Sequence, residues 1–132
     1  MNTALAVMAG GAVGSLLRYL LSVGIAVRFG DAFPWGTLLV NVVGSLGIGL
    51  FAGMTSNGGV LLIPPLARVF VMVGFFGGFT TFSSFSLQTL NLAQDGEFLA
   101  ASGNIVFNLL LCLAAVWIGH TAANLLNSLS LR

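Results

Sequence analysis

The residues that could do chemistry within an apolar segment are concentrated between positions 74 and 86. This stretch combines three glycines and five phenylalanines with hydroxyl side chains, among them those of Thr80, Thr81, Ser83 and Ser84. Glycine weakens a helix by about 1 kcal/mol relative to alanine, and threonine hydroxyls compete for backbone partners and bend helices. In a bilayer, an opened backbone persists only where it is buried in protein or lines a wet cavity. The pattern therefore predicts a membrane helix that is broken near its middle, with the function located at the break.

Two further sets of polar side chains recur every four residues, so each set shares one face of a helix. They are Thr37, Asn41 and Ser45 in one segment, and Asn104, Asn108 and Cys112 in another. A lone buried Asn often only links helices, because an unpaired amide in hydrocarbon costs several kcal/mol. Two Asn residues on one helix that face Asn41 on another favour a polar path more strongly.

Arg18 lies inside the first apolar run, where an arginine costs about 2.5–3.5 kcal/mol on insertion scales. Its place a few residues past the middle of that run is compatible with two roles. The side chain either snorkels toward the first loop or attracts an anion. Cys112 and His120 are each the only residue of their kind. Neither an intrachain disulfide nor a metal site built from a ligand cluster is expected.

Membrane helices must position these residues. The chain is 58% hydrophobic and has only four basic and three acidic residues, whereas a soluble domain is about one quarter charged. Four apolar runs reach the roughly 20 residues that a spanning helix needs. The predicted spans are residues 3–27, 34–54, 64–93 and 98–126. The fold class is thus an all-α membrane protein, with residues 1–132 forming a single four-helix transmembrane domain.

The sequence also indicates where these helices meet and where they begin. Gly10 and Gly14 have the GxxxG spacing that permits close helix contact, and packing alone is the favoured role for them. Pro34 suits the first turn of the second helix, and prolines 64 and 65 open the third. Asp95, in a short acidic turn, is expected to cap the fourth helix.

The charged residues exclude several classes of function. A proton-coupled cation transporter needs a carboxylate within the membrane, but Asp31, Asp95 and Glu97 all fall in predicted loops. The net charge of +1 is too small to suggest nucleic-acid binding. No nucleophile–base pair or phosphate-binding loop indicates an enzyme. Arg18, neutral donors and phenylalanine rings with positive edges remain, and together they predict a path for a small anion.

Three segments resemble the CrcB/Fluc family of fluoride channels. They are GGAVGSLLRY at 10–19, PWGTLLVNVVGS at 34–45 and GFFGGFTTFSSFS at 74–86, in the order expected for the family. The resemblance covers nearly the whole chain. The motif Gly-Gly-x-Thr-Thr-Phe-Ser-x-Phe within a third membrane span is highly specific, whereas a lone GxxxG is not.

The resemblance implies a passive channel that exports fluoride across the plasma membrane, the inner membrane of a bacterium, and so confers fluoride resistance. The partner of the chain would be a second identical chain, in an antiparallel homodimer with two pores along the subunit boundaries. A structural sodium ion at the dimer centre would bind the backbone carbonyls of Gly77 and Thr80.

Both orientations in the membrane are also expected from the basic residues near the span ends. Arg68 and Arg132 would share one side, and Arg28 would lie on the other. Orientation follows such residues, and a difference of one is a weak signal.

The fluoride path is assigned partly by the resemblance and partly by the polar stripes. The resemblance places Asn41, Phe82 and Phe85 in the pore, with Ser83 and Ser84 beside them. The polar stripes add Thr37 and Asn108 to this path. Arg18 is added because its positive charge within the first apolar run could attract an anion. On the fourth helix the chain departs from some members, which carry one Tyr and then two Ser where this sequence has Asn104, Asn108 and Cys112.

Two other functions stay compatible with the residues. One is a channel for chloride or another small anion on the same frame, because selectivity depends on the placement of donors. The other is a membrane scaffold in which the phenylalanines only pack.

Overall fold

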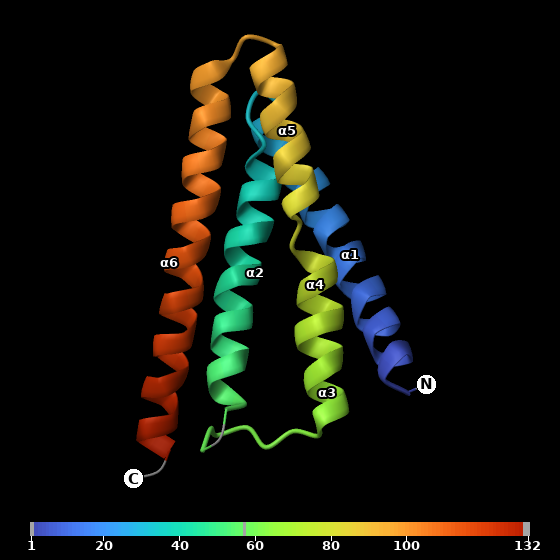
Figure 1. Ribbon diagram of the computed structural model, residues 1–132, viewed down its shortest axis with the longest axis vertical. Coiled ribbons are helices and arrows are strands. Elements are labelled where there is room, and N and C mark those ends of the chain that lie inside the picture. The colour runs from blue at the N-terminus through green and yellow to red at the C-terminus, as the bar shows by residue number, and fades with distance from the viewer. Residues whose placement is uncertain (1, 57, 131–132) are drawn as a thin grey trace.

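The membrane segments of the protein are built from helices in a computed structural model that describes residues 2–56 and 58–130. In chain order the elements are α1 (Asn2–Phe29), α2 (Trp35–Met54), α3 (Pro65–Val69), η1 (Phe70–Phe76), α4 (Gly77–Phe79), α5 (Phe82–Gln94) and α6 (Phe98–Ser130) (Figure 1). Four segments within the described residues are long and apolar enough to cross a membrane: α1, α2, Pro65–Gln94 and α6. The chain is therefore an all-helical, multi-pass membrane protein.

Prolines mark the starts of two spans. Pro34 is the N-cap of α2, so this helix begins at Trp35, one residue later than predicted. Pro64 is the N-cap of α3, and Pro65 is the first residue of that helix, where a missing N–H costs nothing. The last span is longer than predicted, because α6 continues to Ser130.

The prediction that Asp95 caps the fourth helix is wrong. Asp95 is instead the C-cap of α5, and its N–H donates to the carbonyl of Asn91 at 2.9 Å. The next residue, Gly96, has a φ of 82°, a left-handed conformation that glycine adopts without strain and that commonly ends helices. The chain turns there, and α6 begins only at Phe98.

The third membrane segment is not a regular α-helix along its length. Its η1 portion is π-helical, a form in which N–H groups bond five residues back. After α4 ends at Phe79, Thr80 (φ −80°, ψ 157°) and Thr81 (φ −150°, ψ 113°) have extended backbone. The Thr81 hydroxyl then caps α5 by accepting the N–H of Ser84 at 3.2 Å. Two extended residues thus separate α4 from α5.

The segment changes its packing partner at these two residues. Before them η1 and α4 pack on α1, and after them α5 packs on α6, while α2 and α6 pack together (Figure 1). Glycines permit the close contacts: a Cβ on Gly14 would overlap the carbonyl oxygen of Phe75, and one on Gly119 that of Leu46. Gly10 meets η1 in the same way. Gly10 and Gly14 thus have the packing role that their spacing predicts.

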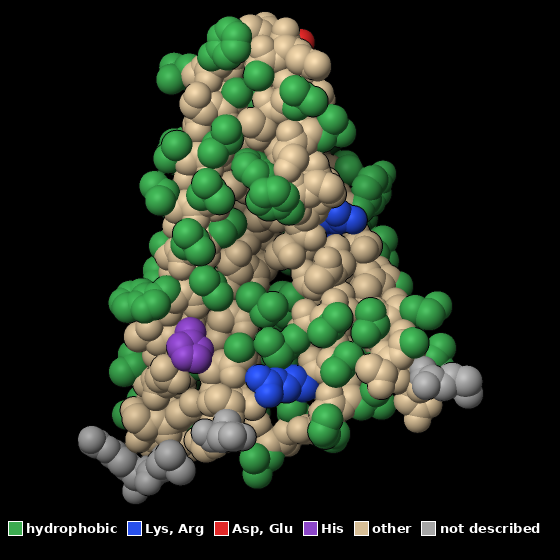
Figure 2. Space-filling view, viewed as in Figure 1, with side chains coloured by type: hydrophobic (Ala, Val, Ile, Leu, Met, Phe, Trp, Pro, Cys, Tyr) green, Lys and Arg blue, Asp and Glu red, His purple; other side chains and the backbone are tan. Residues whose placement is uncertain are grey.

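The outer surface is apolar along the height of the bundle. Figure 2 shows hydrophobic side chains along the height of the visible face, interrupted by basic side chains and a histidine, with acidic colour visible near the end where α5 turns into α6. Large apolar residues such as Leu16, Leu110 and Trp117 are more exposed than buried. A soluble monomer rarely exposes so much contiguous apolar surface, and lipid contact explains it.

Gly14→Ala is expected to destabilise the fold, because its Cβ would meet backbone atoms of η1 and α4 that have no free space to move into. Overpacking of this kind costs about 1–3 kcal/mol. The matched control is Gly24→Ala on the same helix, where a Cβ meets nothing within 4 Å. Thermal unfolding in detergent should show a lower midpoint for Gly14→Ala only, and equal midpoints would contradict this packing.

Candidate functional site

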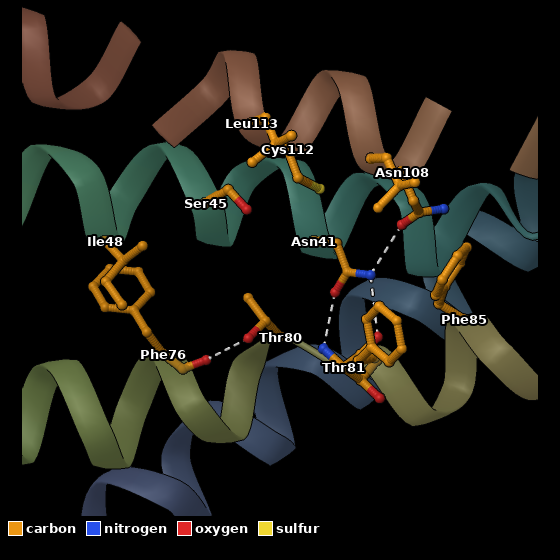
Figure 3. A pocket seen from close by; sticks show the side chains of 12 residues that line it. Asn41, Ser45, Ile48, Phe76, Thr80, Thr81, Phe85, Asn108, Cys112 and Leu113 are labelled. Carbon is orange, nitrogen blue, oxygen red and sulfur yellow. Dashed lines mark hydrogen bonds between the residues drawn. The ribbon is translucent and has the colours of Figure 1, made fainter. Parts of the chain in front are cut away.

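An open cavity of about 310 Å³ lies beside the two extended residues. The residues that line it are Asn41, Ser45, Ile48, Phe76, Thr80, Thr81, Phe82, Phe85, Asn108, Leu109, Cys112 and Leu113 (Figure 3). The polar stripes of α2 and α6 meet here, since Asn41 Nδ2 donates to Asn108 Oδ1 at 3.0 Å. The helical spacing of the stripes therefore led to a correct expectation that Asn108 faces Asn41.

Asn41 supplies the backbone of Thr81 with the partners that the extended conformation removes. Its Oδ1 accepts the Thr81 N–H at 2.8 Å, and its Nδ2 donates to the Thr81 carbonyl at 3.1 Å (Figure 3). All of these groups are buried, where a polar group without a partner costs about 1–3 kcal/mol. The side-chain amide of Asn41 thus replaces a peptide unit and holds the start of α5 against α2.

Two backbone carbonyls just before α5, those of Gly77 and Thr80, lose their regular helical partners. The carbonyl oxygens of Gly77 and Thr80 would accept from the N–H groups of Thr81 and Ser84 in a continuous α-helix. The Thr81 N–H bonds instead to Asn41 Oδ1, and the Ser84 N–H to the Thr81 hydroxyl. Gly77 is exposed, and nothing lies within 4 Å of where its Cβ would be. These oxygens are hard donors that suit a cation such as Na⁺.

The Asn41 amide is the first member of a longer series of hydrogen bonds. Asn108 Nδ2 donates to Asn104 Oδ1 at 2.9 Å, and Asn104 Nδ2 donates to the hydroxyl of Thr89 at 2.8 Å. The Thr89 hydroxyl donates in turn to the carbonyl of Phe85 at 2.8 Å. Asn41, Asn108, Asn104 and Thr89 are called the amide series below. It links α2, α6 and α5, and Asn104 within it is 0% exposed.

The phenylalanines that the sequence places in the path share the cavity. Phe82 and Phe85 are three residues apart on α5, which puts them on nearly the same face. Their ring centroids are 5.1 Å apart and the ring planes lie at 63°, an edge-to-face arrangement. Phe85 is 7% exposed, but Phe82 is 72% exposed. One ring is thus packed in the chain, and the other faces outward at the cavity mouth.

The remaining predicted residues lie outside this cavity. Ser83 and Ser84 do not line it, and their hydroxyls bond to the Thr81 hydroxyl at 3.3 and 3.0 Å. Arg18 is half-buried on α1 and lines neither this cavity nor the one described next. Its two roles, snorkelling and attraction of an anion, both stay predictions.

Thr37 lines a second cavity, of about 400 Å³, at the end of the bundle that carries the first and third loops. This cavity lies between the C-terminal parts of α1 and α5 and the first loop. The exposed carboxylates of Asp31 and Asp95 are at its wall. Because Thr37 is one helical turn from Asn41, the polar face of α2 runs from the second cavity to the first.

Sequence reasoning missed the central role of Thr81 at this site. Thr80 and Thr81 are adjacent and chemically identical, and only the backbone dihedrals show which of them caps α5 and pairs with Asn41. Asn104 was noted in the α6 stripe but not among the site residues, although it is fully buried in the amide series. Its four-residue spacing from Asn108 was the signal that could have included it.

Comparison with known proteins places this sequence in a family. Residues 5–120 match the family model described as CrcB-like protein, Camphor Resistance (CrcB). The chain belongs to the CrcB family. The matched region includes the third segment, both cavities and the whole amide series.

Individual relatives in the CrcB family match over nearly their full length. A protein of Opitutus terrae named fluoride-specific ion channel FluC is 57% identical over 129 residues, covering 98% of this chain and 98% of the relative. Proteins of the same name from Paramagnetospirillum magneticum and Geobacter sulfurreducens are 58% and 47% identical, covering 89% and 93% of this chain and 92% and 98% of the relatives.

Asn41→Ala should lower stability, because it leaves the N–H and carbonyl of Thr81 buried without partners. Each such group costs about 1–3 kcal/mol. The expected results are a lower thermal midpoint in detergent and faster hydrogen exchange of the Thr81 amide.

Ser45→Ala is the matched control for this prediction. Ser45 lines the same cavity one turn along α2, and it makes no bond to the backbone N–H and carbonyl of Thr81, which both pair with Asn41. Asn41→Ala unfolding at the same temperature as Ser45→Ala would show that the Thr81 pairing contributes nothing to stability.

Proposed function

We propose that the protein is a passive, fluoride-selective channel that lets fluoride leave the cytoplasm. The observation that carries this proposal is the similarity, at 57% identity over 98% of both chains, to a protein named fluoride-specific ion channel FluC. The charges agree with it. Asp31, Asp95 and Glu97 are exposed and lie outside the four spans, so no acidic residue of the chain is placed to couple transport to protons. An ion channel of this kind is not an enzyme.

The proposed path follows the polar face of α2. Fluoride enters from the second cavity past Thr37 and passes Asn41 into the first cavity, where it meets Phe82 and Phe85. Moving even a carboxylate-sized ion into a dry medium costs about 20 kcal/mol in the idealised limit, whereas an aromatic contact contributes about 1 kcal/mol. Ring edges therefore work together with retained water, for which a cavity of about 310 Å³ has room.

Hydroxyls near the path are the remaining neutral donors. Ser45 projects into the first cavity beside Cys112 (Figure 3). In the first turn of α5, Ser83 is exposed and Ser84 is half-buried. Weak neutral donors suit conduction, because an ion must bind well enough to enter and weakly enough to leave. In this proposal Ser83 and Ser84 act where Phe82 faces outward.

A second identical chain completes the proposed channel as an antiparallel homodimer. The first cavity is open, Phe82 projects outward and Gly77 is exposed, so one side of the third segment lacks a partner. Arg28 lies in the last turn of α1 and Arg68 lies near the start of the third span, so they are at opposite ends of their spans. Arg132 lies outside the described residues. One basic residue at each described end gives little reason for a single orientation.

A sodium ion at the centre of this dimer is the proposed structural cofactor. The carbonyls of Gly77 and Thr80 lack regular helical partners, and two such carbonyls from each chain would give four hard oxygen ligands. An ion there would satisfy oxygen atoms that have lost their regular helical partners. We place the dimer in the plasma membrane, which is the inner membrane in a bacterium.

Purified protein in fluoride-loaded liposomes should release fluoride once a potassium ionophore clamps the voltage. Matched vesicles loaded with chloride should retain it. Release of both anions would indicate the small-anion channel, and release of neither would indicate the packing-only scaffold. Release that requires a proton gradient would contradict a passive channel.

Phe82→Leu and Phe85→Leu should each lower fluoride flux severalfold while the dimer still elutes as a folded species. The physical reason is the loss of the positive ring edge with most of the apolar volume kept. Phe98→Leu is the matched control, because Phe98 is 69% exposed, close to the 72% of Phe82, and lines neither cavity. Parent-like flux in both single variants would remove the rings from the path.

An experimental structure of the protein in lipid should show two chains in opposite orientations. A single non-water density should lie on their shared axis, within reach of the Gly77 and Thr80 carbonyls of both chains. The carbonyls are expected to converge because the N–H groups that would pair with them in a continuous helix bond elsewhere. A parallel pair would contradict the assembly, and an empty or apolar contact on the axis would contradict the sodium site.

A further inference from the structure

We infer that Asn104 and Thr89 are positioning residues for the permeation path, acting through the amide series to hold α5 and its two phenylalanines. The role in permeation rests on the proposed function, whereas the hydrogen bonds of the amide series do not depend on it. The series attaches α5 at two places. Asn41 holds Thr81 immediately before the helix, and Asn104 holds Thr89 two turns later.

The orientation of every amide in the series follows from the backbone of Thr81. A backbone N–H only donates and a carbonyl only accepts, so Asn41 must turn Oδ1 to the first and Nδ2 to the second. Its other Nδ2 hydrogen then requires Oδ1 of Asn108. Asn108 must turn Nδ2 toward Asn104, and Asn104 must turn Nδ2 toward Thr89. Reversing one amide would place two donors or two acceptors face to face.

Thr89 is suited to end the series because a hydroxyl both accepts and donates. It accepts from Asn104 Nδ2 at 2.8 Å and donates to the carbonyl of Phe85 at 2.8 Å. The series therefore ends on the backbone of a cavity residue. The first and last attachments lie on either side of Phe82 and Phe85 in the sequence, which fixes the rotation of this part of α5 about its axis.

The asparagines of the series have few donors left for an ion. Both Nδ2 hydrogens of Asn41 are used, on the Thr81 carbonyl and Asn108 Oδ1. Both of those of Asn108 are used on Asn104, whose side-chain and backbone oxygens accept at 2.9 and 3.0 Å. Asn104 and Thr89 do not line the first cavity at all. Their influence on an anion there must act through the position of α5.

Thr89→Val tests this role, because it keeps the shape of the side chain and removes the acceptor for Asn104. Fluoride flux per dimer in liposomes should fall severalfold, and Thr89→Ser, which keeps the hydroxyl, should conduct like the parent. Ser86→Ala is the matched control: its hydroxyl donates to the carbonyl of Phe82 at 2.9 Å in the same way, but it bonds to no asparagine. Thr89→Ala breaks the same bond should Thr89→Val fail to assemble.

A spectroscopic measurement on the same proteins separates positioning from local packing. Side-chain NH₂ resonances of Asn108 and Asn41 should shift in Thr89→Val, although neither residue bonds to Thr89, and should stay in place in Thr89→Ser and Ser86→Ala. Unmoved resonances, or parent-like flux in Thr89→Val, would overturn the inference. A parent that conducts no fluoride would refute the proposed function, whereas the resonances decide independently whether the series is continuous.

Discussion

The backbone of Thr81 is the point on which the rest of this structure depends. A membrane offers no water to a peptide group that leaves its helix, so each exposed N–H and carbonyl needs a partner from the protein. Asn41 provides both partners with one side chain. Because that side chain must come from a neighbouring helix at a fixed height, the pairing sets the register between α2 and the third segment. The cavity beside Thr81 exists at the same height for the same reason.

The division of the third segment between two packing partners follows from this constraint. Its first half packs closely on α1 through Gly10, Gly14 and Gly74, and its second half packs on α6. A straight helix could not make both contacts along its length, since α1 and α6 lie on different sides of α2 (Figure 1). Two extended residues allow the change of direction. Glycines lie at the contact between α1 and the first half of the segment and at the contact between α2 and α6, so the interruption is bordered by closely packed helix pairs.

Much of this fold could be predicted from the sequence, because hydrophobicity and helical spacing are local properties. The four spans and the meeting of Asn41 with Asn108 follow from apolar runs and from residues four apart. The failure at Asp95 has a local cause as well: Asp-Gly ends one helix as readily as Asp begins another, and the positive φ of Gly96 decided the outcome. The π-helical stretch, by contrast, accompanies a tertiary contact between Gly74 and Gly10 that no local pattern specifies.

The chemistry of the site was only partly predictable for a different reason. Sequence indicates which side chains carry donors but not which donors are already occupied. Asn41 and Asn108 were expected to offer N–H groups to an anion, and in the structure these groups bond within the protein. For Asn41 that distinction depends on distances of about 3 Å to residues that are 40 and 67 positions away in the sequence. The role of Asn41 and Asn108 in conduction stays a prediction.

The fixed direction of the amide series also bears on how such a sequence can evolve. Each of its members accepts a bond from one neighbour and donates to the next, so a change that suits one position in isolation leaves a mismatch at the adjacent one. Substitutions at positions 89, 104 and 108 are therefore expected to occur together rather than one at a time. Relatives that lack asparagine at 104 or 108 are expected to differ at its neighbours too, and drift at these sites should proceed through coordinated sets of substitutions.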